Sequence, residues 1–477
     1  MTAMAQSRKT IIICGDGLAG LMTARALDAA LSDAFRIILV SVPEPHQEVV
    51  YGSTTSPTAY EFLRTLELSE PVLFTRTSTS FSWGTQYRNW PGATPAWMQC
   101  HHQPFAALAG VPLQHHLTRN QRDLSPLLIS AAAAGQGKFA HPPEDRMHPL
   151  SRAEYGYQFS ASEWGRLIKA QLSQTRVEFS SGPIGNVLKE NGEISKLVLA
   201  AGETLAGDMY IDCTGAERTL LSSLDVAFEA ARRLRVQSQI QPVQGLGPPC
   251  KIVEANATGW RSQTHLQNSV SQIIVTAETD AQAPDAYTIG RVSEAWTGNC
   301  VAIGASAATQ DPLTVAPMVM LQRDIERLLE LVPVGSDAAV ERNEFNRRFE
   351  DDVTHSGLFS DAFYLNVGDE IDPFWTVAKA ASTSDKLNRK RTQFESRGVL
   401  AKYDLEPFND EDWIVLHHGL GHRAKRYDLQ IESVSQAEMN QQLDLMARAI
   451  EQTVSRMPPH HMYVSNMKRY FEKQQYA

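Results

Sequence analysis

The order of apolar and polar positions near the start of the chain predicts a strand, a helix and a second strand in close succession. Ile11 to Cys14 is an unbroken apolar run, as in a strand buried on both faces, and Leu18 to Leu31 carries apolar residues at helical spacing. Phe35 to Val40 is a second apolar run at the distance expected for a βαβ unit. The pattern therefore predicts an α/β protein with a Rossmann-like nucleotide-binding domain.

The turn between the first strand and the helix reads Gly15-Asp16-Gly17-Leu18-Ala19-Gly20. Gly15 permits a tight turn, Gly17 lets phosphates approach, and Gly20 lets the helix pack closely on the strand. Such a turn directs bare backbone N–H groups and the positive end of a helix dipole at one spot, which suits a pyrophosphate. We therefore expect a dinucleotide here; the alternative is a glycine-rich turn without a ligand.

The second strand ends without the acidic residue that binds a ribose hydroxyl in such folds. Ser41 stands at that position, and Glu44, in the next turn, is the nearest carboxylate that could replace it.

Residues 187–215 are typical of the same nucleotide-binding fold. The Asn191-Gly192 pair predicts a hairpin turn, and a β-meander leads into a strand at Met209 to Cys213, which ends at Thr214-Gly215. Flavoproteins with two dinucleotide-binding folds show this pattern near the adenosine.

Residues 299–327 supply a third segment. A buried strand is followed by a turn at Gly304 and by a helix that we expect to begin near Asp311-Pro312, because proline suits the first helical turn. A helix in this place can direct its N-terminus at a flavin ring and stabilise negative charge on it. The three segments together favour FAD over NAD.

Composition and charge exclude several other classes of protein. The 477 residues carry a formal net charge of −10 at pH 7, which argues against a nucleic-acid partner. No apolar run reaches the ~18 residues that a membrane span needs, and the N-terminus lacks the apolar core of a signal peptide. We therefore expect a cytoplasmic protein without a membrane partner.

The cysteines and histidines predict neither a disulfide framework nor a metal site. No two cysteines form a CxxC pair, and those in apparent strands are expected to act as small apolar residues. The histidines occur as adjacent doublets, whose side chains point in different directions. The cysteines are Cys14, Cys100, Cys213, Cys250 and Cys300.

Taken together, the chain resembles the flavin-dependent tryptophan halogenases over most of its length. The resemblance implies a discontinuous FAD-binding domain, for which we expect residues 1–65, 150–220 and 290–335. It implies a mixed, largely helical substrate lobe and cap, for which we expect residues 66–149, 221–289 and 336–477. The segments that carry the resemblance are the glycine turn, Phe81 to Trp90, Gly110 to His116, Tyr155 to Phe159, Tyr210 to Gly215, Gly259-Trp260, Asn299 to Leu313, Asp372 to Trp375, and Trp413 to Gly421.

The resemblance also implies which residues contact FAD. We expect them in the glycine turn, at the end of the second strand, in the turn beside the flavin and in the later segments. They are Gly15, Gly17, Leu18, Ala19, Gly20, Ser41, Ser53, Thr54, Gly215, Gly304, Pro312 and Leu313.

Residues that the family uses for halogenation are replaced in this chain. A halogenase lysine that holds or carries hypohalous acid falls at Ser82 when the chains are aligned on Asn89-Trp90. A halogenase glutamate in a Glu-Pro-Leu-Glu-Ser segment falls at Thr314. A serine hydroxyl cannot form a haloamine or act as an ammonium donor. The catalytic residues are therefore unknown at this stage.

Two further motifs of the family are changed. The WxWxIP motif, which screens the flavin from substrate, keeps only Trp260, and Ser262 stands in place of its second tryptophan. The Gly-Glu-Ser/Ala-Thr turn beside the flavin reads Gly52-Ser53-Thr54-Thr55. Because the nucleotide-binding glycines remain, we infer that the flavin platform is retained while the halogen relay is not.

Reduced FAD reacts with O2 to give a C4a-hydroperoxide, which transfers oxygen to electron-rich arenes when no halide intervenes. The leading expectation is therefore an FAD-dependent monooxygenase that hydroxylates an indole, a phenol or a protein-borne tryptophan. Two alternatives stay open: a flavin-dependent halogenase with an atypical relay, and a flavin-binding protein without turnover.

The expected partners are an aromatic compound and a separate flavin reductase that supplies reduced FAD, because no second GxGxxG for NAD(P)H is present. His101, His102, His115 and His116 are candidate general bases, although each is more readily explained as a structural histidine. A homodimer is compatible with the sequence, which does not reveal the substrate or the oligomeric state.

Overall fold

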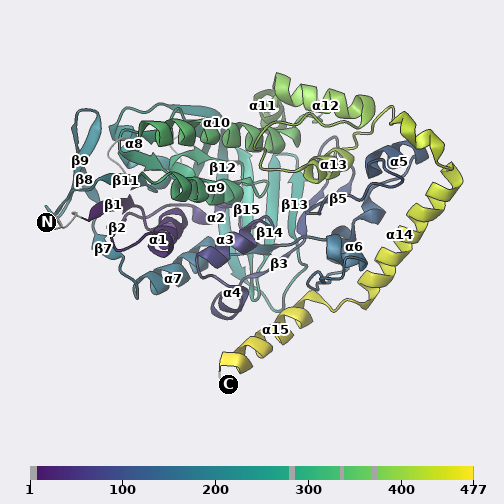
Figure 1. The fold of residues 1–477 in the computed structure, drawn as a ribbon, viewed down its shortest axis with the longest axis horizontal. Coiled ribbons are helices and arrows are strands. Elements are labelled where there is room, and N and C mark those ends of the chain that lie inside the picture. The colour runs from purple at the N-terminus through teal and green to yellow at the C-terminus, as the bar shows by residue number, and fades with distance from the viewer. Residues whose placement is uncertain (1–7, 279–284, 334–337, 368–372, 476–477) are drawn as a thin grey trace, which may run out of the picture.

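The computed structural model describes residues 8–278, 285–333, 338–367 and 373–475. The molecule is elongated, with a parallel sheet at the end that holds the N-terminus, a long antiparallel sheet in the middle and a group of helices at the far end (Figure 1).

The parallel sheet has six strands in the order β17-β18-β11-β1-β2-β7. All neighbouring strands run parallel except β17 and β18, and β1 lies between β2 and β11 with Cys14 opposite Val40 and Asp212. The predicted βαβ unit is thereby confirmed. The strands are β1 (Lys9–Cys14), β2 (Phe35–Ser41), β7 (Glu178–Ser181), β11 (Met209–Asp212), β17 (Trp296–Thr297) and β18 (Cys300–Ala302).

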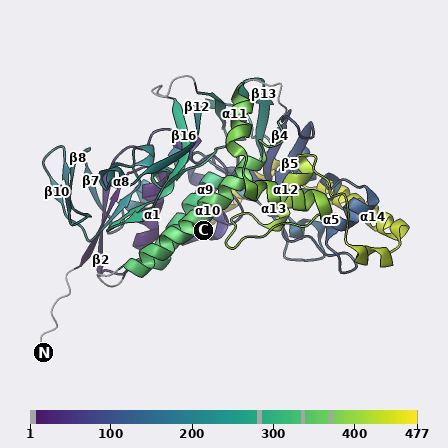
Figure 2. The same ribbon diagram turned by 90° about the horizontal axis from the view of Figure 1, so that it is seen from above.

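Helices pack on this sheet and over its edge. Helix α1 is buried along most of its length and contacts α7 and α9, and α9 lies along the long helix α10 (Figure 2). These helices are α1 (Leu18–Ala30), α7 (Ala161–Leu172), α8 (Thr219–Ser223), α9 (Ala316–Leu331) and α10 (Ala339–Ala362), and shorter helices follow β2 in α2 (Gln47–Val50), α3 (Ala59–Thr65) and α4 (Glu70–Arg76).

The second large sheet has eight strands in the order β19-β16-β12-β15-β14-β13-β4-β5. Neighbouring strands are antiparallel except β13 and β4, which run parallel with Lys251 opposite Thr85. The longest strand, β12, pairs with both β15 and β16. The strands are β4 (Gly84–Arg88), β5 (Ala96–Cys100), β12 (Phe228–Pro242), β13 (Lys251–Asn256), β14 (Gly259–His265), β15 (Ser269–Ala277), β16 (Ala286–Val292) and β19 (Ala308–Thr309).

Two small sheets complete the strands. The predicted meander forms a three-stranded antiparallel sheet of β8 (Ile184–Glu190), β9 (Glu193–Leu199) and β10 (Thr204–Leu205), with Asn191 and Gly192 in the turn. The pair β3 (Ser80–Ser82) and β6 (Gly156–Gln158) lies beside the segment that follows α2, where Thr54 bridges to Gln158.

The far end of the molecule is mainly helical, and the last helix runs back toward the middle (Figure 1). Helix α14 packs against α6 and α5, and α15 reaches α4. The helices are α5 (Leu113–Asn120), α6 (Ile129–Gly135), α11 (Pro373–Ser382), α12 (Asp385–Arg397), α13 (Asp410–Gly419), α14 (Gln436–Arg456) and α15 (His460–Gln475).

The start of α9 differs from the prediction. The helix begins at Ala316, so the proline in its first turn is Pro317, and Asp311-Pro312 lies in the preceding loop. The Asp311 carboxylate is occupied elsewhere, since it accepts hydrogen bonds from Arg232, Tyr364 and the Leu313 N–H. These bonds keep residues 311–313 out of the helix. The Thr314 hydroxyl then accepts from the N–H of Ala316, the first residue of α9.

The predicted fold class is confirmed: the protein is α/β, with a Rossmann-like parallel sheet assembled from separated segments. All five cysteines are free and buried. Within the described residues, no helix is long and apolar enough to cross a bilayer.

Candidate functional site

The glycine turn joins β1 to α1 with very close backbone contacts. Gly15 has a φ of 122°, and a Cβ there would lie 2.1 Å from the Cys213 carbonyl oxygen. A Cβ at Gly20 would lie 1.8 Å from the Gly15 carbonyl oxygen. No larger residue fits either position, because the nearest neighbours are backbone atoms, which cannot turn aside as a side chain can. The turn therefore has the backbone of a phosphate-binding cradle at the N-terminus of α1.

Side chains from the segment after β2 fill this cradle. Oε2 of Glu44 lies 2.3 Å from the point that a Cβ on Gly17 would occupy. Cγ of Glu44 lies 3.0 Å from the point that a Cβ on Gly215 would occupy. The carboxyl accepts hydrogen bonds of 2.8 and 2.9 Å from the Tyr51 hydroxyl. The Leu18 N–H donates to Oε1 of Gln47 at 2.9 Å.

Burial changes the protonation of this cluster. Glu44 is only 5% exposed, and its burial raises the pKa of the carboxyl to about 8, against the smaller opposing effect of the Tyr51 hydrogen bond. Burial and the neighbouring Glu44 raise the pKa of the Tyr51 hydroxyl well above its usual value. At neutral pH the carboxyl is therefore mainly in its acid form.

The Ser41 side chain, at the end of β2, is bonded to the glycine turn. The Ser41 hydroxyl donates to the Asp16 carboxylate, which also accepts from Nζ of Lys169 at 2.8 Å. The Glu44 side chain points inward to Gly17 and Gly215, and its role as a substitute ribose ligand stays a prediction.

The later segments meet the glycine turn at Asp212. Its carboxylate accepts from the backbone and hydroxyl of Thr214, from the Ser306 hydroxyl and from the N-terminal amides of α8. The Ser306 hydroxyl also lies 3.1 Å from the Gly215 carbonyl oxygen. Gly304, with a φ of 66°, lies against Ala19. The structure thus brings Gly215 and Gly304 to the cradle, as expected for one nucleotide site.

The turn at residues 52–55 and the loop at residues 311–314 face each other across a buried lysine. Nζ of Lys251 donates to the Gly52 carbonyl at 3.2 Å and to the Pro312 carbonyl at 2.7 Å. Lys251 is completely buried and makes no ion pair among the described residues. Burial lowers the pKa of its amine to about 7, although Asp311 opposes this effect.

The residues expected at the flavin in these two segments are also buried. Ser53 has a φ of 59° and donates from its hydroxyl to the Glu48 carbonyl, and the Thr54 hydroxyl has no hydrogen-bond partner in the described part of the chain. The Leu313 carbonyl accepts from the Tyr87 hydroxyl at 3.2 Å.

Neither family relay position carries a reactive group. The Ser82 hydroxyl donates to the Gly84 carbonyl at 3.1 Å, and the Thr314 hydroxyl lies 3.2 Å from that of Ser360. Beside Thr314 is a cavity of about 20 Å³, which has room for about one water molecule. It is lined by Thr85, Tyr87, Gln99, His101, Thr314, Val315, Phe359, Phe408 and Asp412.

Of the four candidate histidines, His101 alone lines this cavity, and its Nδ1 lies 3.7 Å from the Asp412 carboxylate. Nδ1 of His102 bonds the Gln103 carbonyl, and burial lowers the pKa of this imidazole to about 4. Nε2 of His116 bonds the Leu108 carbonyl, and His115 lies beside Gly398. The structure does not bring the four together.

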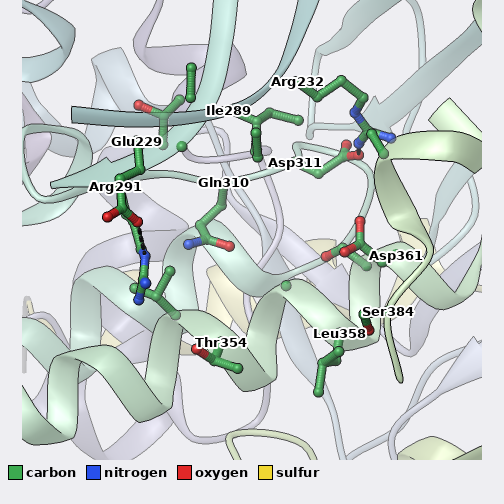
Figure 3. A pocket seen from close by; sticks show the side chains of 18 residues that line it. Glu229, Arg232, Ile289, Arg291, Gln310, Asp311, Thr354, Leu358, Asp361 and Ser384 are labelled. Carbon is green, nitrogen blue, oxygen red and sulfur yellow. Dashed lines mark hydrogen bonds and ion pairs between the residues drawn. The ribbon is translucent and has the colours of Figure 1, made fainter. Parts of the chain in front are cut away.

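A larger cavity of about 400 Å³ lies between β12, β16 and α10 (Figure 3). Two arginines that line it are paired with carboxylates: Arg291 points toward Glu229, with 3.2 Å between Nε and Oε2, and Arg232 bonds Asp311 (Figure 3). Asp361 also faces this cavity, and burial raises the pKa of its carboxyl to about 6.

Sequence reasoning missed Lys251, Gln47 and Tyr51. A signal for Lys251 was present, because in β13 it shares the buried face with Val253 and Ala255, two and four residues further on. Nothing in the local pattern marks Gln47 or Tyr51, whose partners come from α1 and Glu44.

Comparison with known proteins gives concordant results. The profile of the tryptophan halogenase family matches residues 10–436. The chain is 23% identical over 430 residues to tryptophan 6-halogenase ThaL of Streptomyces albogriseolus, covering 80% of this chain and 81% of that protein. It is 21% identical over 524 residues to 7-chloro-L-tryptophan 6-halogenase KtzR of Kutzneria sp., covering 96% and 99%. The structure of BrvH, a flavin-dependent halogenase from Brevundimonas sp. BAL3, has a TM-score of 0.87 at 22% identity, covering 97% and 99%.

Proposed function

Because this chain belongs to the tryptophan halogenase family, we propose that it is a flavin-dependent halogenase that acts on an electron-rich aromatic compound through an atypical relay. The family membership makes it a protein of the FAD-dependent oxidoreductase kind. The proposal reverses the order of the sequence expectations, in which hydroxylation came first, because relatives with this organisation are halogenases.

Flavin-dependent halogenases use reduced FAD, which a separate flavin reductase supplies. In this chain the backbone at Gly15, Gly17 and Gly20 suits the pyrophosphate, and Ser41 and Gly215 lie at the expected adenosine end. Two segments would hold the flavin ring, and they contain Ser53, Thr54, Pro312 and Leu313. The ring supplies the oxidising chemistry when it is bound.

The observation that carries the proposal is the amine of Lys251. The family places a lysine at the position of Ser82, and β13, which carries Lys251, runs parallel to β4 just beyond Ser82. The amine reaches the carbonyls of Gly52 and Pro312, two residues before Thr314. With a pKa of about 7 it is partly neutral at working pH. A neutral amine can react with hypohalous acid to give an N-haloamine and water, exchanging one N–H for an N–halogen bond, and a serine hydroxyl cannot form a haloamine.

Hydroxylation is the second candidate, and a specific observation favours it. Ser82 and Thr314 bear neutral hydroxyls that are bonded within the protein, and Ser262 leaves a small residue where the family has a tryptophan. In this alternative, the chain only holds the arene and excludes water.

The substrate class is an indole or phenol, either free or as a tryptophan of a partner protein. The cavity beside Thr314 has a volume of about 20 Å³. Ligand pockets typically have volumes of several hundred Å³, so this cavity is far too small for an arene as it stands. Substrate entry therefore requires Phe359 or Phe408, which stack on each other at its wall, to move. A homodimer remains a proposal as well.

The test incubates the protein with FAD, a flavin reductase, O2 and a panel of indoles and phenols, with chloride or bromide present or absent. Mass spectrometry of products distinguishes a halogen isotope pair from the gain of one oxygen atom. We expect a halide-dependent product that Lys251→Met abolishes and Lys138→Met leaves. Lys138 is a matched control, because its amine also donates to two carbonyls, those of Val454 and Ser455.

A product that gains only oxygen would replace the proposal by hydroxylation. Halogenation that survives Lys251→Met unchanged would reject the role of this amine. An absence of any product, in protein that is loaded with FAD, would support a flavin-binding protein without turnover.

A further inference from the structure

Three side chains from one eight-residue stretch, residues 44–51, converge on the N-terminus of α1. Gln47 accepts from the Leu18 N–H, Glu44 covers Gly17 and Gly215, and the Tyr51 hydroxyl faces the Ala19 amide while it donates to Glu44. Gln47 and Tyr51 thus occupy two of the backbone donors, those of Leu18 and Ala19, that a bare helix N-terminus would offer to an anion.

A pyrophosphate and these side chains need the same space and the same donors. The point where a Cβ on Gly17 would stand lies only 2.3 Å from a Glu44 carboxyl oxygen. A phosphate oxygen that approached Gly17 would collide with this carboxyl. It would also have to replace Gln47 at the Leu18 N–H.

The short helix that carries Gln47 is fixed in place, so that any opening is local. Oε1 of Glu48, next to Gln47, accepts from the Ser160 hydroxyl at 2.7 Å and from the Ser162 N–H at 3.1 Å, and Oε2 accepts from the Ala161 N–H at 3.2 Å. The N-terminus of α7 thereby anchors α2. Displacement of Glu44 and Gln47 is thus a rotation of side chains, and α2 stays where it is.

We propose that Glu44, Gln47 and Tyr51 close the phosphate cradle of the cofactor-free protein, and that Glu44 sets the affinity for FAD because the cofactor must displace it. The inference rests on the family's use of FAD and is independent of whether the product is halogenated or hydroxylated. The raised pKa of Glu44 supports it, since the acid form has no charge that would drive the side chain out into water.

The experiment measures the dissociation constant of oxidised FAD for the full-length protein at neutral pH, by flavin fluorescence or calorimetry. We expect Glu44→Ala to bind FAD at least tenfold more tightly than the natural protein, and Gln47→Ala at least threefold more tightly. Glu61→Ala is the control for loss of a glutamate away from the cradle, because Glu61 is exposed and pairs with Arg64 on the surface. Its affinity should equal that of the natural protein.

Circular dichroism and thermal melting of the cofactor-free variants establish that each is folded. Gln47→Ala removes a partly exposed side chain, so it keeps the test informative if Glu44→Ala does not fold. The proposal is overturned if no folded variant of Glu44 or Gln47 binds FAD more tightly than the natural protein. A variant that binds FAD tightly and yet gives no product would reject the proposed function and leave this inference standing.

Discussion

Replacing Glu44 by glutamine should change how the stability of the cofactor-free protein depends on pH. Glutamine keeps the size of the side chain and can still accept from the Tyr51 hydroxyl, but it cannot ionise. The variant therefore removes one titration from the folded protein with little change in packing.

The magnitude follows from the difference between two pKa values. The carboxyl titrates near 4.5 when it is unfolded and at about 8 when it is folded, so between these values the folded state binds more protons. Stability due to this group is then present at low pH and is lost as pH rises toward 8, at about 1.4 kcal/mol per pH unit. From pH 6 to pH 8 the loss amounts to about 2 kcal/mol, because the slope falls by half at the pKa itself.

Urea denaturation of both proteins at pH 6, 7 and 8 measures this effect. Other groups also titrate in this range, Lys251 among them, but they do so in both proteins and cancel in the difference. We expect the advantage of the glutamine variant to grow by about 2 kcal/mol from pH 6 to pH 8. If the two proteins lose or gain stability in parallel over this range, the carboxyl is not buried in its acid form, and the description of the cradle is wrong.

Three further substitutions test the site. Gly20→Ala places a Cβ 1.8 Å from a backbone oxygen and should lower stability by roughly 3 kcal/mol or prevent folding, whereas Gly357→Ala on α10 meets open space and should raise the melting temperature slightly. The Lys251 amine has a lower pKa in the folded protein than in the unfolded chain, so the natural protein gains about 1.4 kcal/mol of stability per pH unit between pH 7 and pH 10 from this group. Lys251→Met lacks this gain, so urea denaturation should show the variant becoming less stable relative to the natural protein as pH rises over this range. Asp212→Asn leaves at least two of the donors around this carboxylate without an acceptor, so urea denaturation should show a loss of about 2–4 kcal/mol in the free energy of unfolding. A variant as stable as the natural protein would contradict this.

The sequence could predict the parts of the fold that depend on neighbouring residues. The strands at β1 and β2, helix α1 and the tight turn at Gly15 follow from local periodicity and glycine spacing, and the structure has them within one or two residues. Helix α14 ends at Arg456, directly before Met457-Pro458, as the proline predicts.

The remaining features depend on contacts that are distant in sequence. Helix α9 begins late because Arg232 and Tyr364, which are 79 and 53 residues from Asp311, hold that carboxylate. The sequence marks Glu44 as the nearest carboxylate to the end of β2, but the direction of its side chain is decided by Tyr51 and by the gap between Gly17 and Gly215. No local pattern reports such a gap.

Strand β12 has a mechanical consequence for how this protein can open. It extends over 15 residues and pairs with β16 along residues 228–235 and with β15 along residues 234–242, so this one strand joins two parts of the eight-stranded sheet. A hinge within this sheet would have to break backbone hydrogen bonds between β12 and one of its two neighbouring strands. We therefore expect ligands to enter by movement of individual side chains and short loops, with the sheet intact.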